Sequence, residues 1–98
     1  MLSNFRTYQL AVQLYRECET LRLKSHLRDQ LSRAALSVVL NIAEGSAKPT
    51  PKERRRFYSI ALASTREVQA VLSITDQRAL FGLSDQVGAC LYRLVHPH

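Results

Sequence analysis

The sequence has few residues that interrupt or cross-link a chain. Its 98 residues include three glycines, three prolines, two cysteines and no tryptophan. Two cysteines cannot form the disulfide framework of a small secreted domain, and scarce glycine and proline leave little room for turns. No glycine-rich phosphate loop is present. We therefore expect a few long helices, with Cys18 and Cys90 as free buried thiols rather than a disulfide.

Long apolar runs are also missing. No uninterrupted stretch approaches the roughly 20 residues that span a bilayer, and no N-terminal apolar run suggests a signal peptide. A hydrophobic content of 46% is enough for one core in a chain of this length. We expect a single domain over residues 1–98, located in the cytoplasm and without membrane contact.

Hydrophobic residues recur at helical spacing in four segments. The predicted helices run from Asn4 to Arg22, from the polar link 24–28 to Glu44, from Pro51 to Arg78, and from Ser84 to just before Pro97. Ser3, Ser25 and Ser84 are the expected N-caps, and residues 79–83 the expected last turn. Four helices with short links predict an all-α, antiparallel up-down-up-down four-helix bundle.

The predicted helices carry more apolar surface than one core needs. The expected main stripes are Phe5, Tyr8, Ala11, Val12 and Tyr15; Leu27, Leu31, Ala34, Val38 and Ile42; Phe57, Ile60, Ala61, Ser64, Val68, Val71 and Leu72; and Val87, Leu91, Leu94 and Val95. Outside these stripes lie Leu10, Leu14, Leu21, Leu36 and Leu40. Because a surface helix normally shows one apolar stripe, the second set on the first two helices predicts a homo-oligomer.

The turn between the second and third helices carries the strongest local signal. Gly45 follows the last apolar position and is expected to end the helix in a left-handed conformation. Thr50, Pro51 and Glu53 have the spacing of a capping box with proline at the first helical position. Thr50 is expected to accept from the Glu53 N–H, and Glu53 to reach back to the Thr50 N–H.

The sequence around this turn resembles a known family. Residues 33–45 read RAALSVVLNIAEG, and Ala61, Ser64 and Glu67 follow on the next helix. This pattern is similar to that of the bacterial four-helix-bundle proteins encoded in 23S rRNA intervening sequences. The resemblance implies a toroidal homopentamer, a number that periodicity alone does not supply.

A basic run is the strongest functional feature. The net charge is +6, and residues 48–56 hold five basic side chains against one acidic, a net of +4. The cations lie at a helix N-terminus, where the free N–H groups and the dipole already favour anions. Cations at this position oppose the dipole and lower the stability of the helix. We predict a phosphate-contacting surface of Lys48, Lys52, Arg54, Arg55 and Arg56, with Tyr58 stacking on an unpaired base. The structural alternative is a solvated basic helix end that binds nothing.

Polar residues near the second and third helices form another candidate set: Arg33, Asn41, Glu44, Ser64 and Glu67. Two acids and an amide suggest acid–base chemistry or a metal site, but a hydrogen-bonded helix seam explains them better. Arg33 is expected to supply the counter-charge for Glu44. The three histidines and two cysteines match no zinc-binding spacing, so we expect no metal and no cofactor.

Two functions follow from these features. The first is a non-enzymatic, oligomeric protein that binds nucleic acid, RNA favoured over DNA, through the basic run. The second is a protein-interaction scaffold or accessory subunit that docks a nucleic-acid-processing partner. An enzyme is not expected, because the sequence offers no cofactor motif and no convincing nucleophile–base pair.

Overall fold

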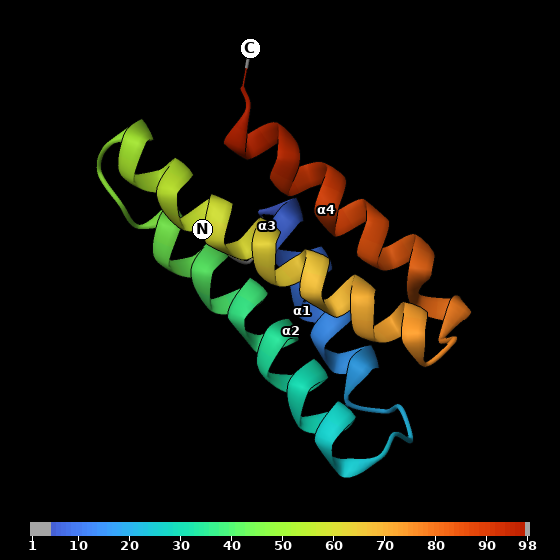
Figure 1. The fold of residues 1–98 in the computed structure, drawn as a ribbon. Coiled ribbons are helices and arrows are strands. Elements are labelled where there is room, and N and C mark those ends of the chain that lie inside the picture. The colour runs from blue at the N-terminus through green and yellow to red at the C-terminus, as the bar shows by residue number, and fades with distance from the viewer. Residues whose placement is uncertain (1–4, 98) are drawn as a thin grey trace.

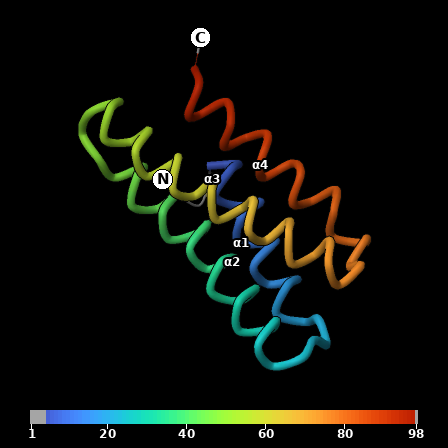
Figure 2. The backbone as a smooth tube through the Cα atoms, viewed as in Figure 1, coloured from blue at the N-terminus to red at the C-terminus, as the bar shows by residue number. Residues whose placement is uncertain are grey.

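The computed structural model describes residues 5–97, which form four α-helices and one short 3-10 helix. The elements are α1 (Arg6–Cys18), α2 (Ser25–Ser46), α3 (Pro51–Ile74), the 3-10 helix η2 (Arg78–Leu80) and α4 (Phe81–Val95). No strand occurs within residues 5–97, so the all-α prediction is confirmed. Figure 1 shows the α2–α3 link at one end of the molecule and the other two links at the opposite end, and the tube in Figure 2 follows the same path.

One hydrophobic core is shared by all four helices. In α1 the buried apolar residues are Leu10, Ala11, Leu14 and Cys18, of which the sequence analysis had placed Leu10 and Leu14 on the second flank. Of the predicted main stripe only Ala11 is buried, whereas Phe5, Tyr8, Val12 and Tyr15 are half-buried at the edge of the core. The two flanks of this helix were therefore assigned in the wrong order.

The buried faces of the other helices follow the predictions more closely. In α2 the residues Leu31, Ala34, Val38 and Ile42 are buried, whereas Leu27 is half-buried. In α3 the buried residues are Tyr58, Ala61, Thr65, Val68, Val71 and Leu72. The alternating spacing of three and four residues from Tyr58 to Leu72 places Phe57, Ile60 and Ser64 at or outside the border of the core. Val87 and Leu91 of α4 are fully buried, as expected.

Two helices end earlier than predicted. α1 ends at Cys18 rather than Arg22, because the Arg28 guanidinium draws the chain into a turn by donating to the carbonyls of Leu21 (2.6 Å) and Glu19 (2.9 Å). α3 ends at Ile74 rather than Arg78, just before Asp76 takes a left-handed φ of 56°. The expected start at Asn4 and the Ser3 cap lie outside the described residues.

Two serine caps were also predicted wrongly. Ser25 is the first residue of α2, after Lys24 at the N-cap, and no side chain caps this helix. Ser84 lies inside α4, which already begins at Phe81, and its buried hydroxyl donates to the Phe81 carbonyl (3.0 Å). The η2 turn leads directly into α4, so this helix needs no serine to start it.

Gly45 does not stop α2, contrary to the prediction. The helix continues to Ser46, and no glycine within residues 5–97 has a positive φ. Gly45 is buried, and a Cβ at this position would lie 2.9 Å from Tyr58 Cε1 and 3.0 Å from Phe57 Cβ. This glycine is therefore required by the close approach of α2 and α3, not by its backbone conformation.

Candidate nucleic-acid interface

The α2–α3 link is fixed by a cap at the start of α3. The Thr50 hydroxyl accepts from the Glu53 backbone N–H (3.2 Å), and Pro51 occupies the first turn, as predicted. The return contact differs, because the Thr50 hydroxyl donates to Glu53 Oε2 (3.0 Å) and the Glu53 carboxylate does not bind the Thr50 N–H. The cap holds the adjacent basic residues on one rigid helical turn.

The five predicted cations, here called the basic cluster, divide into two groups. Lys52, Arg55 and Arg56 are exposed, and none of them makes a hydrogen bond or an ion pair within residues 5–97. Lys48 pairs with Glu44 (2.9 Å), and Arg54 is half-buried and donates to the Lys48 carbonyl (3.0 Å). Arg54 therefore helps to hold the link, whereas the other three cations face solvent.

Phe57 is the aromatic residue that accompanies the basic cluster. Its ring is half-exposed, and the Lys48 ammonium lies 5.2 Å and the Arg56 guanidinium 5.4 Å from the ring centre. Both distances are within the range of a cation–π interaction. The sequence analysis missed this role because it assigned Phe57 to the core.

Tyr58 cannot serve as the predicted stacking platform. Its side chain is only 7% exposed, packs beneath Gly45 and lies 6.5 Å, between ring centres, from Phe5. Burial raises the pKa of the Tyr58 hydroxyl, and the positive charge of Arg54 offsets part of that rise. The ring belongs to the core, so it presents no free face to a base.

The predicted polar seam is only partly assembled. Ser64 shares a hydrogen bond with Ser37 across α2 and α3 (2.8 Å), and the Asn41 amide donates to the Ser37 carbonyl and hydroxyl (2.9 and 3.1 Å). Glu67 accepts a hydrogen bond from Gln30. Ser37 and Gln30 are seam residues that sequence analysis did not include.

Arg33 and Glu44 do not form the predicted ion pair. They lie on one flank of α2 but are 11 residues apart, about 16 Å along the helix axis. Glu44 pairs instead with Lys48, one turn away. Glu44 is also about 21 Å along α2 from Gln30, the partner of Glu67, so the two acids do not meet.

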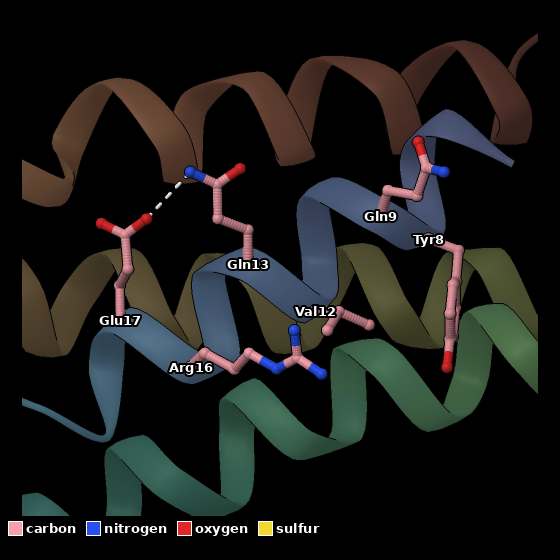
Figure 3. A pocket seen from close by; sticks show the side chains of 6 residues that line it. All are labelled: Tyr8, Gln9, Val12, Gln13, Arg16 and Glu17. Carbon is pink, nitrogen blue, oxygen red and sulfur yellow. Dashed lines mark hydrogen bonds between the residues drawn. The ribbon is translucent and has the colours of Figure 1, made fainter. Parts of the chain in front are cut away.

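A second surface lies on the outer side of α1. Tyr8, Val12 and Arg16 line a shallow hollow of about 500 Å³. Figure 3 shows these three side chains toward α2, and Gln13 donating to Glu17 (2.9 Å) along the other flank of the helix. On α2, Leu36 and Leu40 are 40% and 56% exposed, as the pattern predicted. Both helices thus present apolar side chains to solvent.

The described residues contain no group of three or more acidic, histidine or cysteine side chains that could hold a metal ion. Cys18 and Cys90 are both free thiols, and Cys18 is buried as predicted, whereas Cys90 is only half-buried. Among the helices of residues 5–97, none combines the length and apolar character needed to cross a membrane.

Comparison with models of protein families matches residues 5–90 to the family described as 23S rRNA-intervening sequence protein. The chain belongs to this family. The match covers α1 and most of α4 as well as the α2–α3 segment that carried the sequence resemblance. No curated protein and no solved structure matches the chain significantly.

In this member of the intervening-sequence protein family, the residues that carry the resemblance pack or hydrogen-bond within the bundle. Ala34 and Ile42 are core residues, Gly45 permits the contact with α3, and Asn41 is hydrogen-bonded to Ser37. The motif therefore builds the α2–α3 pair, and the basic cluster lies on the turn that this pair supports.

Proposed function

We propose that this member of the intervening-sequence protein family is a non-enzymatic, homo-oligomeric protein of the cytoplasm that binds nucleic acid through the basic cluster. The observation that carries the proposal is the group of three exposed cations, Lys52, Arg55 and Arg56, which make no hydrogen bond or ion pair within residues 5–97 and lie on the first turns of α3. Cations that have no internal partner are free to neutralise phosphates. RNA is the favoured ligand because the family description refers to intervening sequences of 23S rRNA.

The proposal treats the chain as an antiparallel up-down-up-down bundle that assembles with copies of itself. Its support is the exposed apolar surface, Leu36 and Leu40 on α2 and the hollow beside Tyr8 and Val12 on α1. Family resemblance implies a homopentamer. Each added subunit would contribute another basic cluster, and repeated clusters raise the strength of phosphate binding.

The binding test is fluorescence anisotropy of single- and double-stranded RNA and DNA probes at several salt concentrations. The test variant changes Lys52, Arg55 and Arg56 to alanine, and leaves Arg54 in place because it bonds the Lys48 carbonyl. The matched control changes Arg22, Lys24 and Arg33 to alanine, which removes the same charge from exposed, unpartnered positions elsewhere in the described chain.

We expect the test variant to bind weakly and to lower the slope of log affinity against log salt by about 2 for single strands. The control should keep nearly all of its affinity. If the two triple variants lose affinity equally, only net charge matters and the basic cluster is not the site.

Oligomerisation is tested separately by light scattering. Leu40→Glu should dissociate the oligomer, whereas Ile74→Glu, at an apolar position that is 72% exposed near the other end of α3, should not. A monomeric wild-type protein, or one unaffected by Leu40→Glu, would contradict this part of the proposal.

A second candidate function is a scaffold or accessory subunit for a nucleic-acid-processing protein. It is favoured by Ile60, an exposed apolar residue on α3. Ile60 lies between the Ser37–Ser64 and Gly45–Phe57 contacts, at about the level of the exposed Leu40 on α2. The two residues together offer an apolar surface to a partner protein. Capture of one defined partner from nuclease-treated lysate, lost in Ile60→Glu, would favour this function. Binding of bare RNA by the purified oligomer would favour the first.

A further inference from the structure

A second hollow lies where the start of α3 meets the end of α4. Its volume is about 340 Å³, within the range of small-molecule sites. Its apolar lining comes from three separate parts of the chain and consists of Phe5, Pro51, Leu94 and Pro97. Phe5, the first turn of α3 and the chain at and just beyond the end of α4 thus converge on one concave surface.

The same hollow is bordered by two arginines of the basic cluster, Arg54 and Arg55. Arg54 is held in place by its bond to the Lys48 carbonyl, whereas Arg55 is exposed and without a partner among residues 5–97. One guanidinium is therefore positioned in advance and the other is free to close on an anion. Guanidinium groups bind phosphate through paired N–H donors.

Two aromatic residues are part of the lining of this hollow. Phe5 and Tyr58 pack with their ring planes 57° apart, and Phe5 is half-buried, whereas Tyr58 is almost fully covered. A ring that keeps part of its surface accessible offers a place for a base to stack. A lining that combines apolar and aromatic side chains with two arginines is complementary to a flat base that carries a phosphate.

From this combination we propose that the hollow binds one unpaired nucleotide, with its base against Phe5 and Leu94 and its phosphate on Arg54 and Arg55. This inference rests on the proposed nucleic-acid function and deepens it, because it assigns the base and the phosphate to different residues. A nucleotide within a single strand and a free mononucleotide share this chemistry, so both are used as probes.

The decisive variant is Leu94→Glu, which puts a carboxylate into the hollow. Its matched control is Tyr92→Glu, which adds the same charge to an exposed position on the same helix, outside the hollow. Anisotropy is measured with a short single-stranded RNA and with the same RNA carrying one abasic nucleotide. Calorimetry with a free nucleoside monophosphate is the third measurement. Circular dichroism and light scattering check that both variants fold and assemble.

We expect Leu94→Glu to weaken binding of the intact RNA by about 5- to 150-fold, the range for loss of one stacked base, and Tyr92→Glu to change it much less. The abasic RNA should bind wild type more weakly than the intact RNA, and the two RNAs should bind Leu94→Glu alike. Equal affinities of the two glutamate variants, or no effect of the abasic position on wild type, would overturn the inference while the basic cluster could still bind phosphates.

The mononucleotide separates the two proposals further. Calorimetric binding of the monophosphate that Leu94→Glu abolishes, without binding of any strand, would support the hollow and reject strand binding. If the protein binds neither the RNA nor the monophosphate, the nucleic-acid function and the nucleotide site are both overturned.

Discussion

The two ends of the molecule use their basic side chains differently. At the end opposite to the α2–α3 link, residues 17–29 and 76–85 together carry a net charge of −1. Arg28 donates to the carbonyls of Leu21 and Glu19, and Arg78 pairs with the Asp76 carboxylate (2.7 Å). At the α2–α3 end, residues 48–56 carry +4. Arg54 holds the link there, whereas Lys52, Arg55 and Arg56 make no hydrogen bond or ion pair within residues 5–97. The α2–α3 end therefore carries an excess of positive charge that the opposite end lacks.

The pKa values of a buried thiol and a buried tyrosine hydroxyl reflect the same difference in nearby charge. Burial, together with the nearby negative charges of Glu19 and Glu17, raises the pKa of Cys18, at the opposite end, to about 12. Burial also raises the pKa of Tyr58, at the α2–α3 end, but Arg54 acts in the other direction. The surroundings are negative at one end and positive at the other.

The comparison supports the binding role that we propose for the basic cluster. The α2–α3 link is already held by the Thr50 cap, the Gly45 contact and the Arg54 bond. The three exposed cations add nothing to these contacts, and any cation in the first turn opposes the helix dipole. The folding of the link does not account for these three cations, and the proposed binding of an external phosphate does.

The largest expected effect on the free energy of unfolding comes from substituting one glycine near each end of the molecule, Gly45 and Gly82. Gly45→Ala should lower the free energy of unfolding by about 1–3 kcal/mol, because its Cβ would press on Tyr58 and Phe57. Gly82→Ala should raise it by about 0.5–1 kcal/mol, since nothing lies within 4 Å of a Cβ there and alanine favours the helix. Urea denaturation measures both. Equal effects would show that packing between α2 and α3 is no tighter than at the start of α4.

Gly45 also illustrates which parts of the fold could be predicted from the sequence. Helix number, the capping box and most of the α2 core were predictable, because periodicity and cap chemistry are local. The role of Gly45 was not, since a glycine after an apolar run is compatible with a helix stop. Its distance of seven residues from Val38, and of fourteen from Leu31, was the signal that it continues the buried face.

The candidate site was predictable in composition but not in arrangement. The sequence places five cations within nine residues, but it does not show that Arg54 donates to the Lys48 carbonyl or that Arg54 and Arg55 both border the hollow beside α4. It also exchanged the roles of Phe57 and Tyr58, which are adjacent and both aromatic. The spacing of Tyr58 with Ala61, Thr65, Val68 and Leu72 would have identified the buried ring. The hollow depends on chain segments far apart in sequence, which periodicity cannot bring together.

A smaller effect is expected from the pH dependence of Cys18. The unfolded thiol ionises near pH 9.0, whereas the folded one stays protonated to about pH 12, so a rise in pH across this interval deprotonates only the unfolded chain. The free energy of unfolding should fall by up to about 1.4 kcal/mol per pH unit above pH 9. Urea denaturation between about pH 8 and about pH 10 measures this slope. Cys18→Ala should flatten it, and an unchanged slope would assign it to other groups.

The next effect separates a cation that folds the chain from one that does not. Arg28→Ala should lower the free energy of unfolding by about 1 kcal/mol, because the carbonyls of Glu19 and Leu21 lose their donor. Arg55→Ala should leave it nearly unchanged, since Arg55 has no internal partner in the described chain. RNA affinity should show the reverse order. If Arg55→Ala destabilises the protein as much as Arg28→Ala does, the division between the two ends fails.

The smallest effect uses two lysines at helix starts. Lys52→Glu, in the first turn of α3, and Lys24→Glu, at the N-cap of α2, each exchange a positive for a negative charge beside a helix N-terminus. Each should stabilise the protein by about 0.3–1 kcal/mol, because the helix dipole favours anions there. Thermal or urea denaturation at low salt measures the gain, which high salt should reduce. Only Lys52→Glu should also weaken RNA binding, since Lys24 lies at the end without the basic cluster. Equal losses of affinity would mean that RNA responds to the total charge of the molecule, whereas a loss confined to Lys52→Glu would show that position 52 sacrifices stability for binding.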